Sequence, residues 1–539
     1  MVQLREWQEK LKDEVKSLLK ERKVVFLNSP TGSGKTLFSL VVGLEAYPRV
    51  VVAVRTHNEY TPFYREARRL GKRFAFIVGK AVACPFSSKD VDPEDIKCSS
   101  CPFKASTQVE FALSPNEMVA KLKERAVVEG FCPYYSLLDS TEDAEVLVVT
   151  YPYVFVSYLK EGINLNLKDS LLIVDEAHNL DRLSDLTERT LTLQTIERAK
   201  KEVKSARARE ILSAVEESIK PLLNPDEKYV RVQGKPNVSG EDLKVLAEEL
   251  EDLREEMIKQ RRVRRLWLSS VVKFLSAWLS PDFMIYSALN KLTAKSFSLL
   301  SSFRQVMEEA GGVLLMSGTM PPLSYMRKVL NLGDINPAEV DVTKRFRKGL
   351  TGTFDCLLAL DVTSKFEKRQ VMAERYASYL LKVFYSAKFH VLAVFPSYQF
   401  MESVVSKLKI PAIVEGEETT IESLATLREK SLICAVSRGK LTEGVEVTDE
   451  RGRSLISDVV LVGIPYPPLD DFALDFVRAT GLDENGFIRN NALIAVKQAI
   501  GRAIRGPGDH VTVWLLDKRY EDIWWRKNLN CLNPKRVRL

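Results

Sequence analysis

The stretch Ser29-Pro30-Thr31-Gly32-Ser33-Gly34-Lys35-Thr36 follows the apolar run Val24–Leu27 and precedes the apolar-rich segment Leu37–Val42. This order predicts a strand, a glycine turn and the start of a helix. Glycines let backbone N–H groups approach phosphate oxygens, and a helix N-terminus favours their negative charge. We therefore expect a nucleotide phosphate site in an α/β fold, in which Lys35 reaches the β- and γ-phosphates and Thr36 binds Mg²⁺. Ser29 stands where glycine is usual, and the alternative is a glycine-rich turn beside an unrelated lysine.

The length and composition describe an ordinary globular chain of several domains. Its 539 residues exceed one core, and the usual domain size of roughly 150 residues predicts three or four units. A net charge of +7 is compatible with a polyanionic partner without proving one. No apolar run reaches roughly 18 residues, and the first residues are charged, so we expect an intracellular protein without a membrane partner.

Strand signals recur before and after two interruptions. Val50–Val54, Val146–Thr150, Leu171–Val174 and Val313–Met316 all read as buried strands. Between Gly79 and Cys132, however, prolines, serines and charges predominate, which predicts a small inserted domain.

The second interruption runs from about Asp185 to Leu300, where strand signals nearly vanish. Here a coiled-coil-like seam at 3,4 spacing predicts a helical insert, through Leu243, Leu246, Leu250, Leu253 and Met257. A basic run follows, which is either a solvated face or a surface for nucleic acid or a partner, at Arg261, Arg262, Arg264 and Arg265.

A second α/β unit follows the helical insert. Its expected buried strands form a second parallel sheet, at Val391–Phe395, Leu432–Val436, Val459–Ile464 and Val511–Leu516. Two α/β units with one phosphate loop between them suggest a nucleotide bound where they meet.

Charged residues at two places fit the chemistry of phosphoryl transfer. Asp175 and Glu176 end a strand, where Asp175 is suited to hold Mg²⁺ and Glu176 to orient and deprotonate the attacking water. Arg502 and Arg505 lie three residues apart in the segment Gln498–Arg505, on one helix face, where both can point at the γ-phosphate.

These strings occur together and in order in superfamily 2 helicases, as motifs I (Ser29–Thr36), II in its DEAH form (Asp175–His178), III (Ser317–Thr319) and VI (Gln498–Arg505). With Val54–Glu59, Ser437–Val445 and four cysteines before motif II, the chain resembles the XPD family of iron-sulfur DNA helicases over nearly its whole length. The resemblance implies ATP-driven 5′ to 3′ translocation on single-stranded DNA, duplex unwinding and a role in nucleotide excision repair. Glu446 departs from the aspartate that is more usual in the family.

The resemblance also implies a domain division and further nucleotide contacts. Two RecA-like motor domains with parallel sheets are expected, the first discontinuous over 1–79, 133–190 and 301–345, and the second over 346–539. An iron-sulfur insert at 80–132 and a helical arch insert at 191–300 interrupt the first. Arg5 and Gln8 resemble the family's adenine-recognising motif, and Gln498 is expected among the nucleotide-binding residues.

Four of the seven cysteines cluster, with 13, 2 and 30 residues between Cys84, Cys98, Cys101 and Cys132. This spacing fits a structural zinc site as well as an iron-sulfur cluster. Proline after three of the four is typical of ferredoxin clusters, and the family resemblance favours 4Fe-4S. The remaining cysteines are expected to be buried thiols rather than disulfides, at Cys356, Cys434 and Cys531.

Single-stranded and forked DNA are the expected partners. Backbone contacts in the first motor are expected near the ends of its strands, from Arg55, Thr56, His57, Thr150 and Tyr151. A cation and two aromatics beside the cysteines are expected to grip and stack bases near the fork, namely Lys80, Phe131 and Tyr134.

The sequence also predicts roles for three further histidines and leaves open a possible protein partner and two rival functions. His178 is expected to link the nucleotide to the second sheet, and His390 and His510 to be structural. A repair protein is a possible partner of the helical insert. Two rival functions are a DNA-independent ATPase and a scaffold subunit with a vestigial motor.

Overall fold

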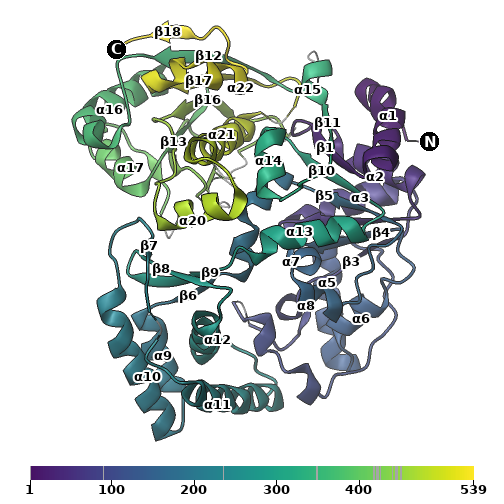
Figure 1. Cartoon of the computed structure of the whole chain (residues 1–539). Coiled ribbons are helices and arrows are strands. Elements are labelled where there is room, and N and C mark those ends of the chain that lie inside the picture. The colour runs from purple at the N-terminus through teal and green to yellow at the C-terminus, as the bar shows by residue number, and fades with distance from the viewer. Residues whose placement is uncertain are drawn as a thin grey trace.

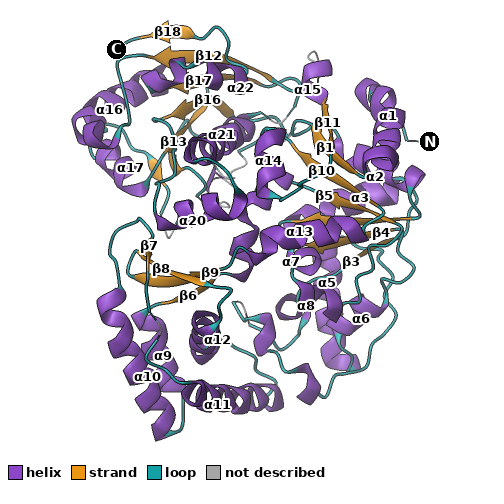
Figure 2. Cartoon of the chain, in the orientation of Figure 1, coloured by secondary structure: helices purple, strands orange, loops and turns teal. Residues whose placement is uncertain are grey.

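The computed structural model describes residues 2–88, 90–234, 236–346, 350–416, 419, 424, 427–439, 441–442, 447–449, 452–504 and 506–539. Across these residues the chain forms two seven-stranded sheets and one four-stranded sheet. Figure 1 shows the two larger sheets side by side, with the third below them, and Figure 2 shows helices on both faces of the larger sheets. The two motor domains expected from the sequence are confirmed.

The first sheet carries the N-terminal phosphate loop. All of its paired strands are parallel. In spatial order they are β11 (Ala338–Asp341), β1 (Val24–Asn28), β10 (Gly312–Ser317), β5 (Ser170–Val174), β2 (Arg49–Val54), β4 (Val146–Thr150) and β3 (Phe74–Phe76). The central strands lie where the apolar runs predict them.

Alternate residues of each strand face opposite layers of helices. In β1, Val24 and Phe26 pack on one face, and Val25 and Leu27 on the other. One layer contains α1 (Glu6–Arg22), α2 (Lys35–Ala46) and α3 (Tyr60–Arg69); the other contains α7 (Pro152–Phe155), α13 (Ser298–Glu309) and α14 (Leu323–Val329). Burial on both faces explains why these strands are continuous apolar runs.

The cysteine-containing insert is largely irregular and packs beside the first sheet. Its helices are α4 (Lys80–Ala83) and α5 (Pro115–Glu129), and α6 (Pro133–Asp139) follows it. Met118 and Leu122 of α5 join the same core as α1 and α2. The insert is therefore anchored to the first motor domain through α5 and through Ala83, Val109 and Phe131, which join the same core.

The second insert is not purely helical, so the expectation of vanishing strands is wrong. Its helices are α9 (Leu193–Glu202), α10 (Ala206–Ile219), α11 (Gly240–Lys259) and α12 (Trp267–Leu279). An antiparallel sheet joins them, with strands in the order β6 (Arg189–Leu191), β9 (Lys291–Lys295), β8 (Met284–Ala288) and β7 (Val230–Arg231). The expected seam is confirmed in α11, where Leu246, Leu250, Leu253 and Met257 are buried.

The hairpin of β8 and β9 lacks the usual sequence signal. Its two-residue turn is Leu289-Asn290, and both residues have positive φ angles, 50° and 55°. Tight hairpins need this left-handed backbone and normally obtain it from Asn-Gly or Asp-Gly. Because leucine is unusual in such a turn, the sequence does not predict a hairpin here.

The second motor domain contains more strands than the sequence predicts. The described strands, all parallel to their neighbours, are β14 (Ile413–Val414), β15 (Leu432–Val436), β13 (His390–Phe395), β16 (Ile456–Leu461), β17 (His510–Leu515), β12 (Thr353–Ala359) and β18 (Lys535–Val537). The helices named in this domain are α16 (Arg369–Ser386), α17 (Tyr398–Val405), α20 (Asp471–Thr480), α21 (Glu484–Ala503) and α22 (Ile523–Asn528). The four expected strands lie side by side, and the sequence missed the short edge strands β14 and β18 and the inner strand β12.

Cys356 and Cys531 form a disulfide, which corrects the expectation of two buried thiols. The chain end after α22 returns to β12, so residues 175 positions apart come to a Cα–Cα distance of 5.9 Å. The rule against intracellular disulfides is a tendency with exceptions and could not exclude this pair. Cys434 is a buried free thiol, as expected.

The arch insert contacts both of its neighbours. Arg254 of α11 donates to the buried carboxylate of Asp95 in the cysteine insert, at 2.7 Å. Tyr286 of β8 donates to Asp475 of α20, at 2.8 Å. Among the described helices, none is both long and apolar enough to cross a bilayer.

Candidate active site

The phosphate loop joins β1 to α2 and is held by its own side chains. The hydroxyl groups of Ser29 and Ser33 lie 2.7 Å apart, and Ser33 donates to the Pro30 carbonyl at 2.6 Å. Gly34 has a φ of +92°, and a Cβ built on it would lie 2.8 Å from Nε2 of Gln8. Only glycine fits this left-handed and crowded position, as a phosphate-binding turn requires.

The start of α1 holds the loop from outside. Arg5 Nη1 donates to the Gly32 carbonyl at 2.7 Å, and Gln8 Nε2 donates to the Gly34 carbonyl at 2.9 Å. Trp7 Nε1 donates to the Ser33 carbonyl at 3.1 Å, a contact that sequence reasoning missed. Gln8 is 1% exposed and its side-chain oxygen accepts from the Arg5 amide, so the structure gives it a supporting role. Its contact with a nucleotide base stays a prediction.

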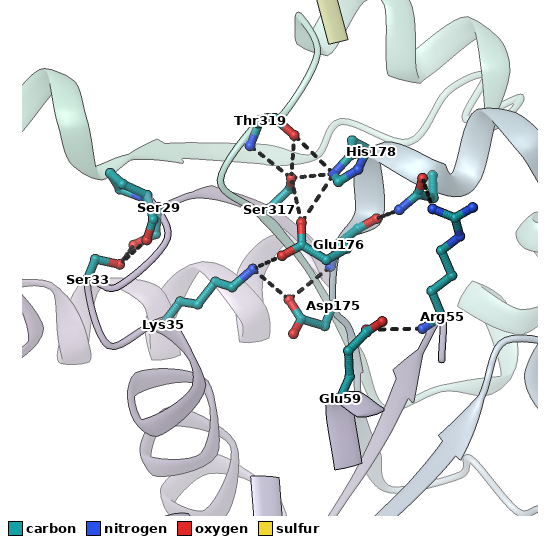
Figure 3. A network of polar contacts seen from close by, with 12 residues as sticks. Ser29, Ser33, Lys35, Arg55, Glu59, Asp175, Glu176, His178, Ser317 and Thr319 are labelled. Atoms are coloured by element: carbon teal, nitrogen blue, oxygen red, sulfur yellow. Dashed lines mark hydrogen bonds and ion pairs between the residues drawn. The ribbon is translucent and has the colours of Figure 1, made fainter. Parts of the chain in front are cut away.

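Lys35 and the acidic pair meet although they are far apart in sequence. Lys35 Nζ lies 2.9 Å from Asp175 Oδ1 and 2.5 Å from Glu176 Oε1 (Figure 3). Burial disfavours the Lys35 charge, but the two carboxylates more than offset this, and the pKa of Lys35 is raised. Burial would raise the pKa of Glu176, yet Lys35 reverses the shift and lowers it. Burial raises the pKa of Asp175.

The turn after β5 aims the two carboxylates. Glu176 has a φ of 49°, an uncommon backbone state for a residue with a side chain. The Tyr151 hydroxyl supports this turn by donating to the carbonyls of Asp175 and Glu176, at 2.5 and 3.1 Å. Tyr151 is 3% exposed, so its side chain lies in the core under the site, and its contact with DNA stays a prediction.

His178 connects the acidic pair with the second motor domain. Its Nδ1 lies 2.7 Å from the Ser317 hydroxyl and 3.3 Å from Glu176 Oε2. On the other side of the ring, Nε2 lies 2.8 Å from Nε2 of Gln498 on α21. The histidine therefore makes the link to the second domain that the sequence predicts.

Arg502 lies near the end of α21 and donates from Nε to the Thr442 carbonyl, at 2.8 Å. Arg505, Lys440 and Glu446 lie outside the described residues. Catalytic roles for Arg502 and Arg505 stay predictions.

The loop after β2 is held by an acid that sequence reasoning missed. Glu59 accepts from the backbone amides of Arg55 and Thr56, each at 3.2 Å. Burial, and then the charges of Asp175 and Glu176, raise the pKa of Glu59 to about 7. Thr56 is exposed, and Arg55, His57 and Thr150 are half-buried, so all four stay candidates for DNA contact.

The expected base-stacking aromatics are buried. Phe131 and Tyr134 are 4% and 7% exposed. Arg125 lies over the Phe131 ring at 5.6 Å, and Lys80 over the Tyr134 ring at 5.8 Å. In this structure the two rings lack the free faces that stacking needs, and Lys80, which is half-buried, is the better placed of the three for a DNA contact.

The four clustered cysteines line one pocket, together with Phe86, Phe103 and Ile258. Each of the four is half-buried. Burial, with the other three thiols nearby, raises the pKa of Cys84 to about 11. Within the described residues, no three such side chains are grouped tightly enough for a single metal ion. The four thiols that the sequence selects thus share one pocket, and their role as ligands of a common cluster stays a prediction.

The two parallel-sheet domains and the lysine-carboxylate site define a nucleotide-hydrolysing motor of the superfamily 2 helicase class. The helicase C-terminal domain model matches residues 380–534 and the DEAD_2 model matches residues 78–193. The ATP-dependent DNA helicase XPD of Sulfolobus acidocaldarius is 42% identical over the full length of both chains. The chain belongs to the XPD family of ATP-dependent DNA helicases.

Solved structures agree with this assignment. The structure named XPD_Helicase covers both chains fully, with a TM-score of 0.94 and 42% identity. That named XPD_APO has a TM-score of 0.82 and 38% identity, over 98% of this chain and 100% of the other. A more distant relative, the ATP-dependent DNA helicase CHL1 of Kluyveromyces lactis, is 25% identical over 72% of this chain and 56% of its own length.

Proposed function

We propose that this chain hydrolyses ATP where its motor domains meet, moves 5′ to 3′ on single-stranded DNA and unwinds duplex DNA during nucleotide excision repair. The observation that carries the proposal is the contact of Lys35 with Asp175 and Glu176, linked through His178 to Gln498 of the second domain. Direction and pathway follow from membership of the family.

Residues of both motor domains have separate roles in ATP hydrolysis. Thr36 and Asp175 hold Mg²⁺, and Lys35 binds the β- and γ-phosphates. Phosphates that draw Lys35 away from Glu176 leave its Oε1 free to orient the attacking water and accept a proton from it. Arg502 and Arg505 stabilise the transferred phosphoryl group.

Cys84, Cys98, Cys101 and Cys132 hold a 4Fe-4S cluster in this proposal. The shared pocket and the prolines that follow three of the cysteines support it. The cluster would fold the insert around its ligands and hold Lys80, with Phe131 and Tyr134 packed behind it, near the fork. Purified protein should contain iron and acid-labile sulfide; one zinc per chain instead would show that the cysteines form a zinc site.

Four further points belong to the proposal. DNA contacts come from Arg55, Thr56, His57 and Thr150. The arch insert is the surface for a repair-protein partner, and the protein works inside the cell. The domain limits are those given above, except that β6 (Arg189–Leu191) pairs within the arch sheet, which supports moving the arch boundary to 189.

The proposal is tested with tailed duplexes, each of which carries one single-stranded tail. A 5′ tail should support ATP-dependent unwinding and a 3′ tail should not. Unwinding from the 3′ tail alone would reverse the polarity. ATP turnover that DNA does not stimulate, without unwinding of either substrate, would favour a DNA-independent ATPase.

A further inference from the structure

A buried carboxylate lies beneath the turn that follows β15. Glu415 comes directly after β14 and is 3% exposed. Its Oε2 accepts from the Val436 amide at 2.7 Å, and its Oε1 accepts from the Leu441 amide at 3.2 Å. One side chain thus holds Val436, where the turn Val436–Gly439 begins, and Leu441 beyond the turn.

The approach of this carboxylate requires glycine in the turn. A Cβ on Gly439 would lie 2.4 Å from Oε1 and 2.7 Å from Oε2 of Glu415. Burial of a carboxylate is costly unless hydrogen bonds compensate it, and hydrogen bonds to a charged group are about twice as strong as neutral ones. The turn is therefore shaped closely around Glu415.

The same turn is connected to the arginine helix. Thr442 donates from its hydroxyl to the Val436 carbonyl at 2.9 Å, while its own carbonyl accepts from Arg502 Nε at 2.8 Å. Arg438 in the turn donates to the Asn491 carbonyl on α21 at 3.0 Å. A shift of the turn would therefore move the carbonyl that orients the Arg502 guanidinium.

We infer that Glu415 is a positioning residue for ATP hydrolysis: it fixes the turn Val436–Gly439 together with Leu441 and, through the Thr442 carbonyl, aims Arg502. This inference rests on the proposed role of Arg502 at the γ-phosphate. Glu415 itself touches neither the nucleotide nor the reacting atoms in this account. Its effect is indirect and must disappear when Arg502 is absent.

A double-mutant cycle in the full-length protein tests this dependence. Glu415→Ala should lower kcat for DNA-stimulated hydrolysis roughly tenfold, with a change in KM for ATP below about threefold. In the Arg502→Ala background the same substitution should change kcat less than about twofold. Equal losses in both backgrounds would overturn the inference.

Two further variants separate positioning from general stability. Glu415→Gln keeps one oxygen that can accept an amide and should restore part of the kcat lost in Glu415→Ala. Asp458→Asn is the control, because it removes another buried carboxylate of this domain, which accepts from Trp514 Nε1 at 2.9 Å. It should lower the melting temperature about as much as Glu415→Ala does, yet leave kcat near the wild-type value. An equal loss of kcat in Asp458→Asn would show that Glu415 acts only through stability.

The outcomes distinguish this inference from the function on which it rests. If Arg502→Ala alone leaves kcat unchanged, the proposed role of Arg502 fails. If Arg502→Ala lowers kcat but Glu415→Ala does not, only the positioning role fails.

Discussion

The two halves of the nucleotide site are built differently. In the first domain, Lys35 Nζ at the start of α2 lies within 2.9 Å of both Asp175 and Glu176, which follow strand β5. In the second domain, Arg502 is held by the Thr442 carbonyl of its own domain. The first half is thus assembled by the sheet itself, whereas the second depends on a turn and on how α21 meets the first domain.

Among the described residues, polar contacts that join the halves involve side chains beside the chemistry. His178 contacts Gln498, and Asn491 of α21 donates to the Tyr325 hydroxyl of the first domain at 3.2 Å. Such contacts can report the state of one half to the other. Substitutions in the two halves should therefore differ in how they change ATP turnover, ATP affinity and DNA stimulation.

Removal of Lys35 should have the largest effect. Lys35→Ala should abolish measurable ATP turnover, because it removes the charge that binds the phosphates. Binding of single-stranded DNA should persist in a fluorescence titration. The control is Lys12→Ala on α1, which loses only a surface contact with Glu45. Turnover by Lys35→Ala close to that of the control would contradict the assignment of the first half.

Arg502→Ala tests the second half. Loss of an arginine that acts in the transition state should lower kcat by about 10³-fold with a smaller loss of ATP affinity. Steady-state kinetics and nucleotide binding measure the two quantities separately. Equal losses in both would mean that Arg502 only binds the ground state.

Cys98→Ser tests a region outside both halves. The variant should lose iron and fail to unwind a forked duplex, because the segment from Cys84 to Cys132 loses its ligands. ATP hydrolysis should persist in part, since none of the proposed hydrolytic residues lies in the insert. Normal unwinding by an iron-free variant would refute a role for the insert at the fork.

His178→Ala should uncouple the halves rather than disable either. Coupling between sites in proteins is usually worth about 5- to 150-fold, so we expect roughly a tenfold loss of DNA stimulation. Turnover without DNA should change less. The prediction fails if DNA-free and DNA-stimulated rates fall by the same factor.

Glu59→Gln should have the smallest effect, on the pH dependence of stability. Because the pKa of Glu59 rises from its ordinary 4.5 to about 7 in the folded protein, the folded state holds the proton more tightly. The free energy of unfolding should therefore fall as pH rises through this window. Melting temperatures from about pH 5 to about pH 8 should fall more steeply for wild type than for Glu59→Gln. Parallel curves would show that the carboxyl titrates normally.

Sequence reasoning succeeded where local pattern determines structure. The phosphate loop combines glycines, a strand and a helix start within a few residues, and the acidic pair ends an apolar strand. It failed where the signal is short or distant: the hairpin turn uses Leu289, the edge strand β18 is largely charged, and Cys356 meets Cys531 only in three dimensions. Trp7 bonds to the backbone of another segment and carries no motif of its own, whereas Glu59 closes a Thr-x-x-Glu capping box with Thr56, a local signal that the sequence analysis did not use.

The central claim is that DNA controls ATP hydrolysis at a site shared by two motor domains. The most direct test measures ATP turnover of the full-length protein with and without single-stranded DNA, for wild type and Arg502→Ala. We predict that DNA raises wild-type turnover several-fold, on the order of the usual coupling between sites, and that the rate in Arg502→Ala stays low with DNA present. Wild-type turnover that is the same with and without DNA would contradict the account.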